Sequence, residues 1–269
     1  YKERYGEMTD LYDRPYQTDY RNSVWNCGIL PVYRQQLYSV YGEYKNTARE
    51  FFATVNLTHN REWYNRIYEQ RIENGQVQRV SLPLSNHGSG YTVKSTLSKG
   101  FYDLGLKTSF LALLNISKAE QSSGGQRLPY QYRLMRLEPK VIWTPNRHWE
   151  TSYQTDIRYG GNKIGERTRL APLWNVTQQV QLSYIFSPIE ASLSVDPYHN
   201  DVNEDQSVNA VFADFSVLWK SRRWQITATA TNLFDKRTYA YTRYASLESY
   251  TSWVRIRPRE FLVAIRYRL

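Results

Sequence analysis

The sequence contains one cysteine, Cys27, among its 269 residues. An internal disulfide or a zinc site built from several thiolates is therefore excluded for this chain. It also lacks any run near the roughly 20 consecutive apolar residues that a membrane-spanning helix requires. The best apolar cluster, residues 110–114, is much shorter. A helical membrane protein is thus excluded, whereas a membrane β-barrel, in which only alternate residues are apolar, is not.

Acidic residues are fewer than basic ones, 25 against 35, which gives a net charge of +10. Such an excess can indicate nucleic acid, an anionic surface or an anionic ligand as partner. The basic residues are spread along the chain, clusters such as residues 255–259 are short, and no basic helix is visible. We therefore expect no nucleic-acid partner. The chain begins at Tyr1 without a methionine or a leader, which predicts a mature or truncated product.

Alternation of apolar and polar residues dominates the chain, and no segment of comparable length has a 3.6-residue period. In the last stretch one face carries Phe261, Val263, Ile265, Tyr267 and Leu269, and the other carries Leu262, Ala264, Arg266 and Arg268. This period of two predicts a strand with one apolar face. Similar segments recur from about residue 36 onward and number about eleven. The 24 tyrosines and 8 tryptophans fit either a membrane interface or a soluble β-sandwich core.

Two kinds of connection tend to alternate along the chain. We expect tight turns at residues 45–47, 99–103, 144–146, 187–188 and 220–222, and longer polar loops around 58–90, 119–128, 160–170, 198–207 and 236–250. Short periplasmic turns opposite long extracellular loops are typical of outer-membrane barrels. Trp143 and Trp149 flank one short turn, and Trp219 and Trp224 flank another, as expected of an interfacial aromatic belt.

These patterns predict an all-β fold, an antiparallel transmembrane β-barrel in the cell outer membrane. Residues 1–35 have no clear period and are expected to form an extracellular loop; residues 36–269 supply the barrel strands. The Asn74-Gly75 pair between alternating runs predicts a hairpin inside the 58–90 connection.

The count of about eleven strands is odd, whereas bacterial single-chain barrels normally have an even number. An open edge in lipid leaves backbone groups unpaired at several kcal/mol each. Either residues 1–35 contain a twelfth strand, or the chain is the C-terminal half of a larger barrel. We favour the second interpretation.

The C-terminus carries a more specific pattern. Residues 228–239 read Ala-Thr-Ala-Thr-Asn-Leu-Phe-Asp-Lys-Arg-Thr-Tyr, residues 257–261 read Arg-Pro-Arg-Glu-Phe, and the chain ends Arg-Tyr-Arg-Leu. This stretch of about 45 residues resembles the last two strands of TonB-dependent outer-membrane receptors, in a style similar to those of Bacteroides-like bacteria. Leu269 stands where that family usually has Phe.

The resemblance implies a 22-stranded barrel with an internal plug, of which this chain would supply about eleven C-terminal strands. The plug domain and the N-terminal strands would lie outside this chain. It further implies uptake of a large scarce nutrient, such as an iron chelate or cobalamin, without catalysis and without a cofactor. The implied partners are TonB through that plug, lipid and lipopolysaccharide, the remaining barrel strands or a partner chain, and a surface lipoprotein.

Ligand-binding candidates come from the polar strand faces and one loop. The polar faces should point into the lumen, where charges are tolerated. Contact with the plug or a permeating ligand is one reading, and simple solvation of a wide barrel is the other. Tyrosines of the 236–250 loop could grip a ligand, because Tyr offers large contact area at low entropy cost. The candidates are Arg136, Glu138, Arg158, Asp214, Tyr239, Tyr241 and Tyr244.

Metal and catalytic signals are weak. Asp201, Asn203 and Asp205 resemble the start of a calcium loop, but Gln206 replaces the required Gly, so we expect a solvated acidic loop and no metal. The four histidines lack metal-ligand spacing and are expected in loops or the lumen.

Two further classes remain open. One is a complete small porin or outer-membrane enzyme barrel of about twelve strands, although no catalytic nucleophile stands out. The other is a soluble sugar-binding β-sandwich or propeller.

Overall fold

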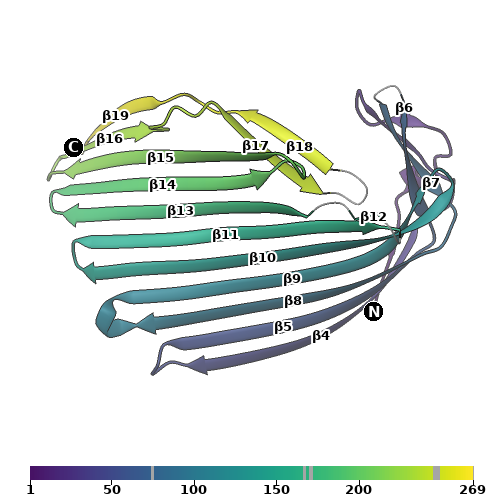
Figure 1. Ribbon diagram of the computed structural model, residues 1–269, viewed down its shortest axis with the longest axis horizontal. Helices are drawn as coiled ribbons and strands as arrows, with labels where there is room; N and C mark the ends of the chain where they lie inside the picture. The colour runs from purple at the N-terminus through teal and green to yellow at the C-terminus, as the bar shows by residue number, and fades with distance from the viewer. Residues whose placement is uncertain (74–75, 166–167, 170–171, 245–248, 269) are drawn as a thin grey trace.

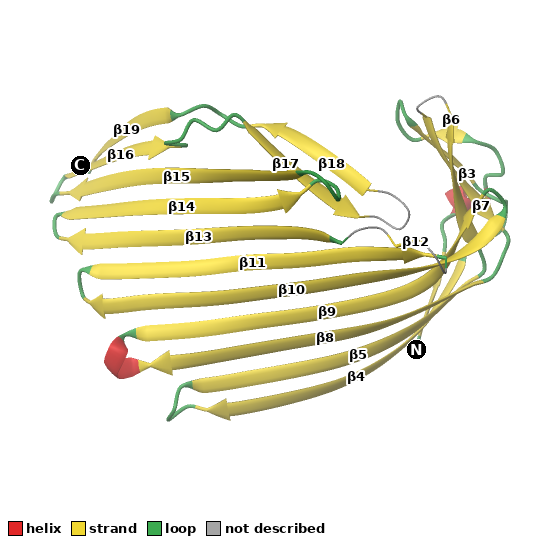
Figure 2. Cartoon of the chain, viewed as in Figure 1, coloured by secondary structure: helices red, strands yellow, loops and turns green. Residues whose placement is uncertain are grey.

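The computed structural model describes residues 1–269 except 74–75, 166–167, 170–171, 245–248 and 269. The described chain is built almost entirely of strands, with two short 3-10 helices, η1 (Met8–Leu11) and η2 (Tyr102–Leu104) (Figure 2). No helix within the described residues is long and apolar enough to cross a membrane.

Eleven long strands lie side by side in one antiparallel sheet, each hydrogen-bonded to the next (Figure 1). In spatial order they are β4 (Val32–Asn46), β5 (Phe51–Tyr64), β8 (Asn86–Phe101), β9 (Leu106–Ser123), β10 (Gln126–Asn146), β11 (Trp149–Ile164), β13 (Leu173–Phe186), β14 (Ile189–Asp201), β15 (Ser207–Lys220), β16 (Trp224–Thr231) and β19 (Glu260–Tyr267). The all-β antiparallel fold is therefore as the alternation predicted.

In the part of the chain that the structure describes, eight shorter strands accompany the long ones. Six of them, β1 (Lys2–Tyr5), β2 (Tyr16–Gln17), β3 (Asn22–Trp25), β6 (Ile67–Glu73), β7 (Gln76–Leu82) and β12 (Thr168–Arg169), join the large sheet. The other two, β17 (Thr238–Tyr244) and β18 (Ser249–Arg255), form a separate two-stranded sheet.

The five predicted tight turns all lie at the same end of the sheet, on the left in Figure 1. They separate β4 from β5, β8 from β9, β10 from β11, β13 from β14, and β15 from β16. We call this the short-turn end and the opposite one the loop end.

The loop end differs from the sequence expectation because the strands extend farther than predicted. Where a loop was expected at 119–128, β9 and β10 stay paired until Ser123 and Gln126, with only Gly124 and Gly125 between them. Both glycines have positive φ, which suits a tight turn. Likewise β14 continues to Asp201, and β15 begins at Ser207. Polar residues on both faces obscure the alternation there, but the backbone ladder continues.

The hairpin predicted within residues 58–90 is confirmed: β6 and β7 pair from Ile67–Leu82 to Glu73–Gln76, and the Asn74-Gly75 turn lies outside the described residues. The expected loop of residues 1–35 contains short strands instead. β1 pairs with the start of β4, and β3 pairs in parallel with β7. The N-terminal segment is thereby attached to the β6–β7 hairpin.

The register gives the sheet two chemically different faces. Ile265 of β19 lies opposite Ile226, Ile226 opposite Trp219, and Trp219 opposite Ile189, so apolar residues continue from strand to strand. We call this the outer face. The opposite, polar face carries the charged residues identified in the sequence, namely Arg136, Glu138, Lys140, Glu150, Asp156, Arg158, Glu190, Asp214 and Arg266.

The outer face is not covered by other parts of the described chain. Val40 is 68% exposed and Val263 is 64% exposed, although both are apolar residues in regular strands. The few buried apolar side chains include Ile67 and Val80 of the β6–β7 hairpin. The sheet therefore leaves most of its apolar surface without a protein partner.

Both edges of the eleven-stranded array are open within the described residues. β19 pairs only with β16, and β4 beyond Gln35 pairs only with β5. β4 leads into a short turn, and β19 ends where Tyr267 lies opposite Trp224, also at the short-turn end. The two edge strands consequently run in the same direction.

Candidate functional site

The polar face and the β17–β18 hairpin together enclose a cavity of about 630 Å³. The long strands β9, β10, β11, β13 and β14 contribute one side, and β17 contributes the other. Its lining residues are Leu113, Tyr132, Leu134, Arg136, Asp156, Arg158, Gly160, Leu173, Asn175, Thr177, Asn200, Tyr239, Tyr241 and Thr242.

A carboxylate shared by two guanidinium groups forms the charged part of this cavity. Arg136 donates two hydrogen bonds to Asp156, from Nε to Oδ1 at 3.1 Å and from Nη2 to Oδ2 at 2.9 Å. Arg158 donates to the same carboxylate, with Nη2 at 2.6 Å from Oδ2. Arg136 is also ion-paired with Glu138. Register explains the cluster, because Arg136 and Arg158 are direct neighbours across β10 and β11.

The cluster has no net formal charge, since two guanidiniums balance two carboxylates. Both arginines remain partly accessible, with 37% of the Arg136 and 48% of the Arg158 side chain exposed. Five N–H donors on each guanidinium exceed what the two carboxylates use. The cavity can therefore offer both donors and acceptors to a polar solute.

The β17–β18 hairpin lies against the polar face of the sheet. Asn200 of β14 donates from Nδ2 to the carbonyl oxygen of Ala240 at 3.1 Å, and both residues are buried. The ring of Tyr239 packs edge-on against Tyr198 with centroids 4.6 Å apart. The 236–250 connection, expected as a loop, is thus largely a hairpin, and it brings tyrosines to the Arg136–Asp156–Arg158 cluster.

The structure brings together four of the seven predicted ligand-binding residues, since Arg136, Arg158, Tyr239 and Tyr241 line this cavity. Glu138 adjoins it through its ion pair with Arg136. Asp214 does not line it; its Oδ1 accepts the backbone N–H of Asn232 at 2.7 Å. The Tyr244 side chain lies outside the described residues. That these residues bind a ligand stays a prediction.

The weak metal candidate is engaged in local hydrogen bonds. Asp201 accepts from the backbone N–H of Trp174 at 2.8 Å and contacts His199 at 3.0 Å. Asn203 accepts the backbone N–H of Asp205 at 2.9 Å. Within the described residues, no group of three His, Cys, Asp or Glu side chains is arranged to hold a metal ion.

The expectation that all histidines lie in loops or the lumen is wrong for three of them, His59, His87 and His199. His59 lies on the outer face, opposite Tyr91 and Tyr38, with ring centroids 4.3 and 6.2 Å away. His87, which lies opposite Trp63, and His199 also have outer-face register. The alternation of the sequence gives all three positions this parity, so the strand pattern could have identified them.

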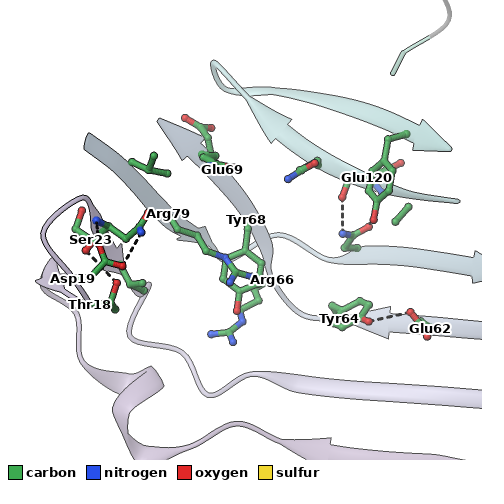
Figure 3. A pocket seen from close by; sticks show the side chains of 18 residues that line it. Thr18, Asp19, Ser23, Glu62, Tyr64, Arg66, Tyr68, Glu69, Arg79 and Glu120 are labelled. Atoms are coloured by element: carbon green, nitrogen blue, oxygen red, sulfur yellow. Dashed lines mark hydrogen bonds between the residues drawn. The ribbon is translucent and has the colours of Figure 1, made fainter. Parts of the chain in front are cut away.

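A second cavity, which the sequence reasoning missed, lies at the loop end (Figure 3). Its volume is about 680 Å³. Strands β3, β6 and β7 and the turn that precedes β3 contribute one side, and β5, β8, β9 and β10 contribute the other. Arg79 and Arg66 flank the ring of Tyr68, at 3.6 and 4.8 Å from its centroid. Arg66 is paired with Asp10 at 2.9 Å.

Glu62 gives this cavity an acidic side. Its carboxylate accepts from the Tyr33 hydroxyl at 3.1 Å, Gln35 at 3.1 Å, Asn60 at 2.9 Å and the Tyr64 hydroxyl at 3.0 Å. Four neutral donors therefore hold the carboxylate in place. The Asn74-Gly75 pair indicated the hairpin that forms one side of this cavity. The sequence did not indicate that this hairpin contacts the N-terminal segment.

Glu69 fixes the β6–β7 hairpin to the rim of the sheet. Its buried carboxylate accepts from the Ser122 hydroxyl at 2.7 Å, from Arg71 at 2.9 Å and from the Gly125 N–H at 3.3 Å. The Ser122 hydrogen bond, followed by that of Arg71, lowers the pKa of Glu69. The ionised form is thus the one that attaches the hairpin.

Comparison with known proteins gives little guidance. No family model matches the chain, and no curated protein matches it. Among solved structures, the chain is similar to the translocator domain of autotransporter NalP from Neisseria meningitidis. The identity is 11%, over 91% of this chain and 83% of that chain, with a TM-score of 0.29. A likeness at this level carries no argument about function, which must be inferred from the residues and geometry above.

Proposed function

We propose that this chain forms part of the wall of an outer-membrane β-barrel transporter. The observation that carries the proposal is the outer face, an uncovered apolar band bordered at both ends by aromatic side chains. At the short-turn end the rings pair as Trp149–Tyr184 and Trp224–Tyr267, with centroids 4.5 and 4.7 Å apart. We call this the short-turn belt. Aromatic rings collect at both boundaries of a membrane-spanning barrel.

A second belt lies at the loop end. It consists of Tyr38, His59 and Tyr91 on one side of the sheet and of Tyr159 and Trp174 farther along, with the last two centroids 4.8 Å apart. We call this the loop-side belt. Trp149 and Tyr159 lie in opposite belts on β11. Ten residues span about 34 Å along a strand. With a strand tilt of about 40°, this gives a height of about 26 Å, close to the about 25 Å of an outer-membrane apolar band.

The open edges support a barrel completed by further strands. Unpaired backbone groups in lipid cost several kcal/mol each, so β4 and β19 need partners. Both edge strands run toward the short-turn end. An added arc that pairs antiparallel with both must begin and end with strands running the other way, and therefore contains an odd number of strands. Eleven more strands, as in a 22-stranded barrel, meet this condition.

The alternative of a complete twelve-stranded barrel finds less support. It requires a spanning strand within residues 1–35, and a spanning strand has about 9–11 residues. Before β4 begins at Val32, the strands of that segment contain four residues or fewer. An enzyme barrel would also need a nucleophile beside a base, and none of the described residues that line the cavity containing Arg136 and Asp156 is a Ser or a His.

Within this proposal, we infer TonB-dependent uptake of a large scarce nutrient from the C-terminal resemblance alone. The Arg136–Asp156–Arg158 cavity would contact the solute or the plug, and the plug that engages TonB would be supplied outside the residues of this chain. The substrate would be a polar solute, because the cavity offers both guanidinium donors and carboxylate acceptors.

A quenching experiment tests the membrane placement. Two variants are made in a Cys27→Ser background, one with Leu193→Cys and one with Ser194→Cys. Each is labelled at its single cysteine with the same environment-sensitive fluorophore, and the protein is kept in its native membrane. Leu193 has outer-face register and Ser194 has polar-face register on the same strand. Nitroxide-labelled lipid should quench the label at 193 strongly and the label at 194 weakly. Equal quenching at both positions would contradict the proposal.

A further inference from the structure

A groove of about 660 Å³ lies on the outer face at the loop ends of β14 and β15, beside the turn that follows β16. Pro197, Val211 and Phe234 supply apolar surface, and His199, Asn209 and Lys236 supply polar groups. Pro197 lies opposite Val211, and His199 lies opposite Asn209. The apolar part is therefore nearer the middle of the membrane band, and the polar part is nearer the loops.

The wall of the groove formed by residues 232–236 is held by a compact hydrogen-bond network. Leu233 donates its N–H to the carbonyl of Ala213 at 2.8 Å, which keeps the turn beside β15. Asn232, with φ of 52°, donates from Nδ2 to the carbonyls of Lys236 and Arg257, each at 2.8 Å, and accepts the Lys236 N–H at 2.9 Å. This network fixes the backbone from which Phe234 and Lys236 project.

The groove lies at the level of the loop-side belt. His199 is opposite Val176 on β13, two residues from Trp174 of that belt. Phe234 is 55% exposed, although it adjoins a regular apolar face. The headgroups of a bilayer with the proposed placement would meet Lys236, and its acyl chains would meet Phe234 and Val211.

Positive charge at the rim of the groove favours the binding of an anionic group. Lys236 is exposed and forms no ion pair within the described residues. Arg257 and Arg259 are also exposed, and the Asn232–Arg257 hydrogen bond keeps that segment next to the turn. The nearby Asp201 carboxylate is already bound to the Trp174 N–H and to His199.

We propose that this groove binds one phosphate-bearing lipid of the outer leaflet. An acyl chain lies on Pro197, Val211 and Phe234, and the phosphate contacts the Lys236 ammonium at the rim, near Arg257. The inference rests on the proposed membrane placement, because only that placement brings lipid to the outer face.

Binding of monophosphoryl lipid A to the detergent-purified protein, followed by native mass spectrometry, tests the inference. Loss of a charge-assisted contact should weaken binding about tenfold in Lys236→Gln. Phe234→Ser should weaken it as well. Lys118→Gln removes an exposed lysine elsewhere on the outer face and should leave binding unchanged. A heat-dependent shift in gel mobility shows that each variant is folded.

Two further binding measurements show whether the groove recognises the phosphate as part of a lipid or as a free ion. Fully dephosphorylated lipid A should bind more weakly than the phosphorylated form, and inorganic phosphate at the same concentration should not compete. Equal binding of both lipids, or equal loss in Lys118→Gln and Lys236→Gln, would overturn the inference. If lipid quenches the label at 193 but Lys236→Gln binds lipid A normally, only the assignment of the groove is wrong. If lipid does not quench the label at 193, both the membrane placement and the groove assignment are wrong.

Discussion

Asn200 of β14 donates from its side-chain Nδ2 to the carbonyl oxygen of Ala240 in β17, and the two atoms are 3.1 Å apart in a buried contact. This hydrogen bond joins the β17–β18 hairpin to the polar face of the large sheet. The hairpin backbone belongs to a separate two-stranded sheet. Its position therefore depends on side-chain contacts such as this one and the Tyr198–Tyr239 ring pair.

Replacing Asn200 with alanine should loosen the hairpin. The buried Ala240 carbonyl would lose its partner, at a cost of about 1–3 kcal/mol. We expect faster amide hydrogen exchange across residues 238–244 with little change in β14. Gln181→Ala, at an exposed position on the same face, serves as control. Unchanged exchange in the hairpin of Asn200→Ala would show that other contacts hold it.

Removing the shared carboxylate should destabilise the polar face. Asp156→Ala leaves Arg136 and Arg158 close together without the anion between them. We expect a loss of about 1–3 kcal/mol in the free energy of unfolding, measured by urea titration in detergent. Asp205→Ala, in an exposed turn, should cost much less.

A double-mutant cycle separates pairing from general loss of charge. Arg136→Gln combined with Asp156→Ala should destabilise less than the sum of the two single changes, because residues in one ion-pair network are coupled. Strict additivity would mean that the bidentate pair contributes little to stability.

Charge introduced on the outer face should block assembly into the membrane. Leu193→Arg places a guanidinium near the middle of the proposed apolar band, at a cost of about 2–4 kcal/mol. Ser194→Arg places the same group on the polar face of the same strand and should be tolerated. The measurement is the yield of folded protein in the outer-membrane fraction. Equal yields for the two variants would argue against lipid contact at Leu193.

Attachment of the β6–β7 hairpin should depend on pH. The Ser122 and Arg71 hydrogen bonds lower the pKa of Glu69 in the folded protein. A lowered pKa means that this stabilisation is complete above the unfolded value of about 4.3 and is lost as pH falls through the folded pKa. The protection factor of the amides in residues 67–73, which compares their exchange rate with that of an unstructured chain at the same pH, should therefore fall on acidification below about pH 4.

Glu69→Gln should remove most of that pH dependence and raise exchange at neutral pH, because the amide cannot replace the carboxylate as partner of Arg71. Glu204→Gln, in an exposed turn, provides the control. An acid transition that persists in Glu69→Gln would assign the effect to another group.

The strand pattern and the turn positions were predictable because alternation reports a local property of the chain. Val263 and Ala264 differ in face simply because they are adjacent in a strand. The predicted tight turns contain residues that favour turns, such as Gly100 and Pro145. This is why the sequence indicated the eleven-stranded array and its two faces.

The cavity that contains Arg136 and Asp156 could not be predicted in the same way, because it depends on where the β17–β18 hairpin folds back onto the sheet. Arg136 and Arg158 share a face by parity, but no pattern in residues 238–255 indicates that Tyr239 packs on Tyr198. The extension of β9 and β10 to Gly124 was missed because both faces are polar there, so the period-two signal fades although the ladder continues. The N-terminal segment was missed because its strands are too short to show a period.

The junction between β16 and β19 has one more consequence. Thr231 and Glu260 lie opposite each other, so the ladder closes at that point independently of the 28 residues between them. Within the intervening segment, the β17–β18 hairpin leaves the sheet and lies against its polar face, held by the Asn200–Ala240 hydrogen bond. On the proposed membrane placement this hairpin is away from lipid, so its length and composition can change, and solute recognition with them, without altering the β16–β19 ladder.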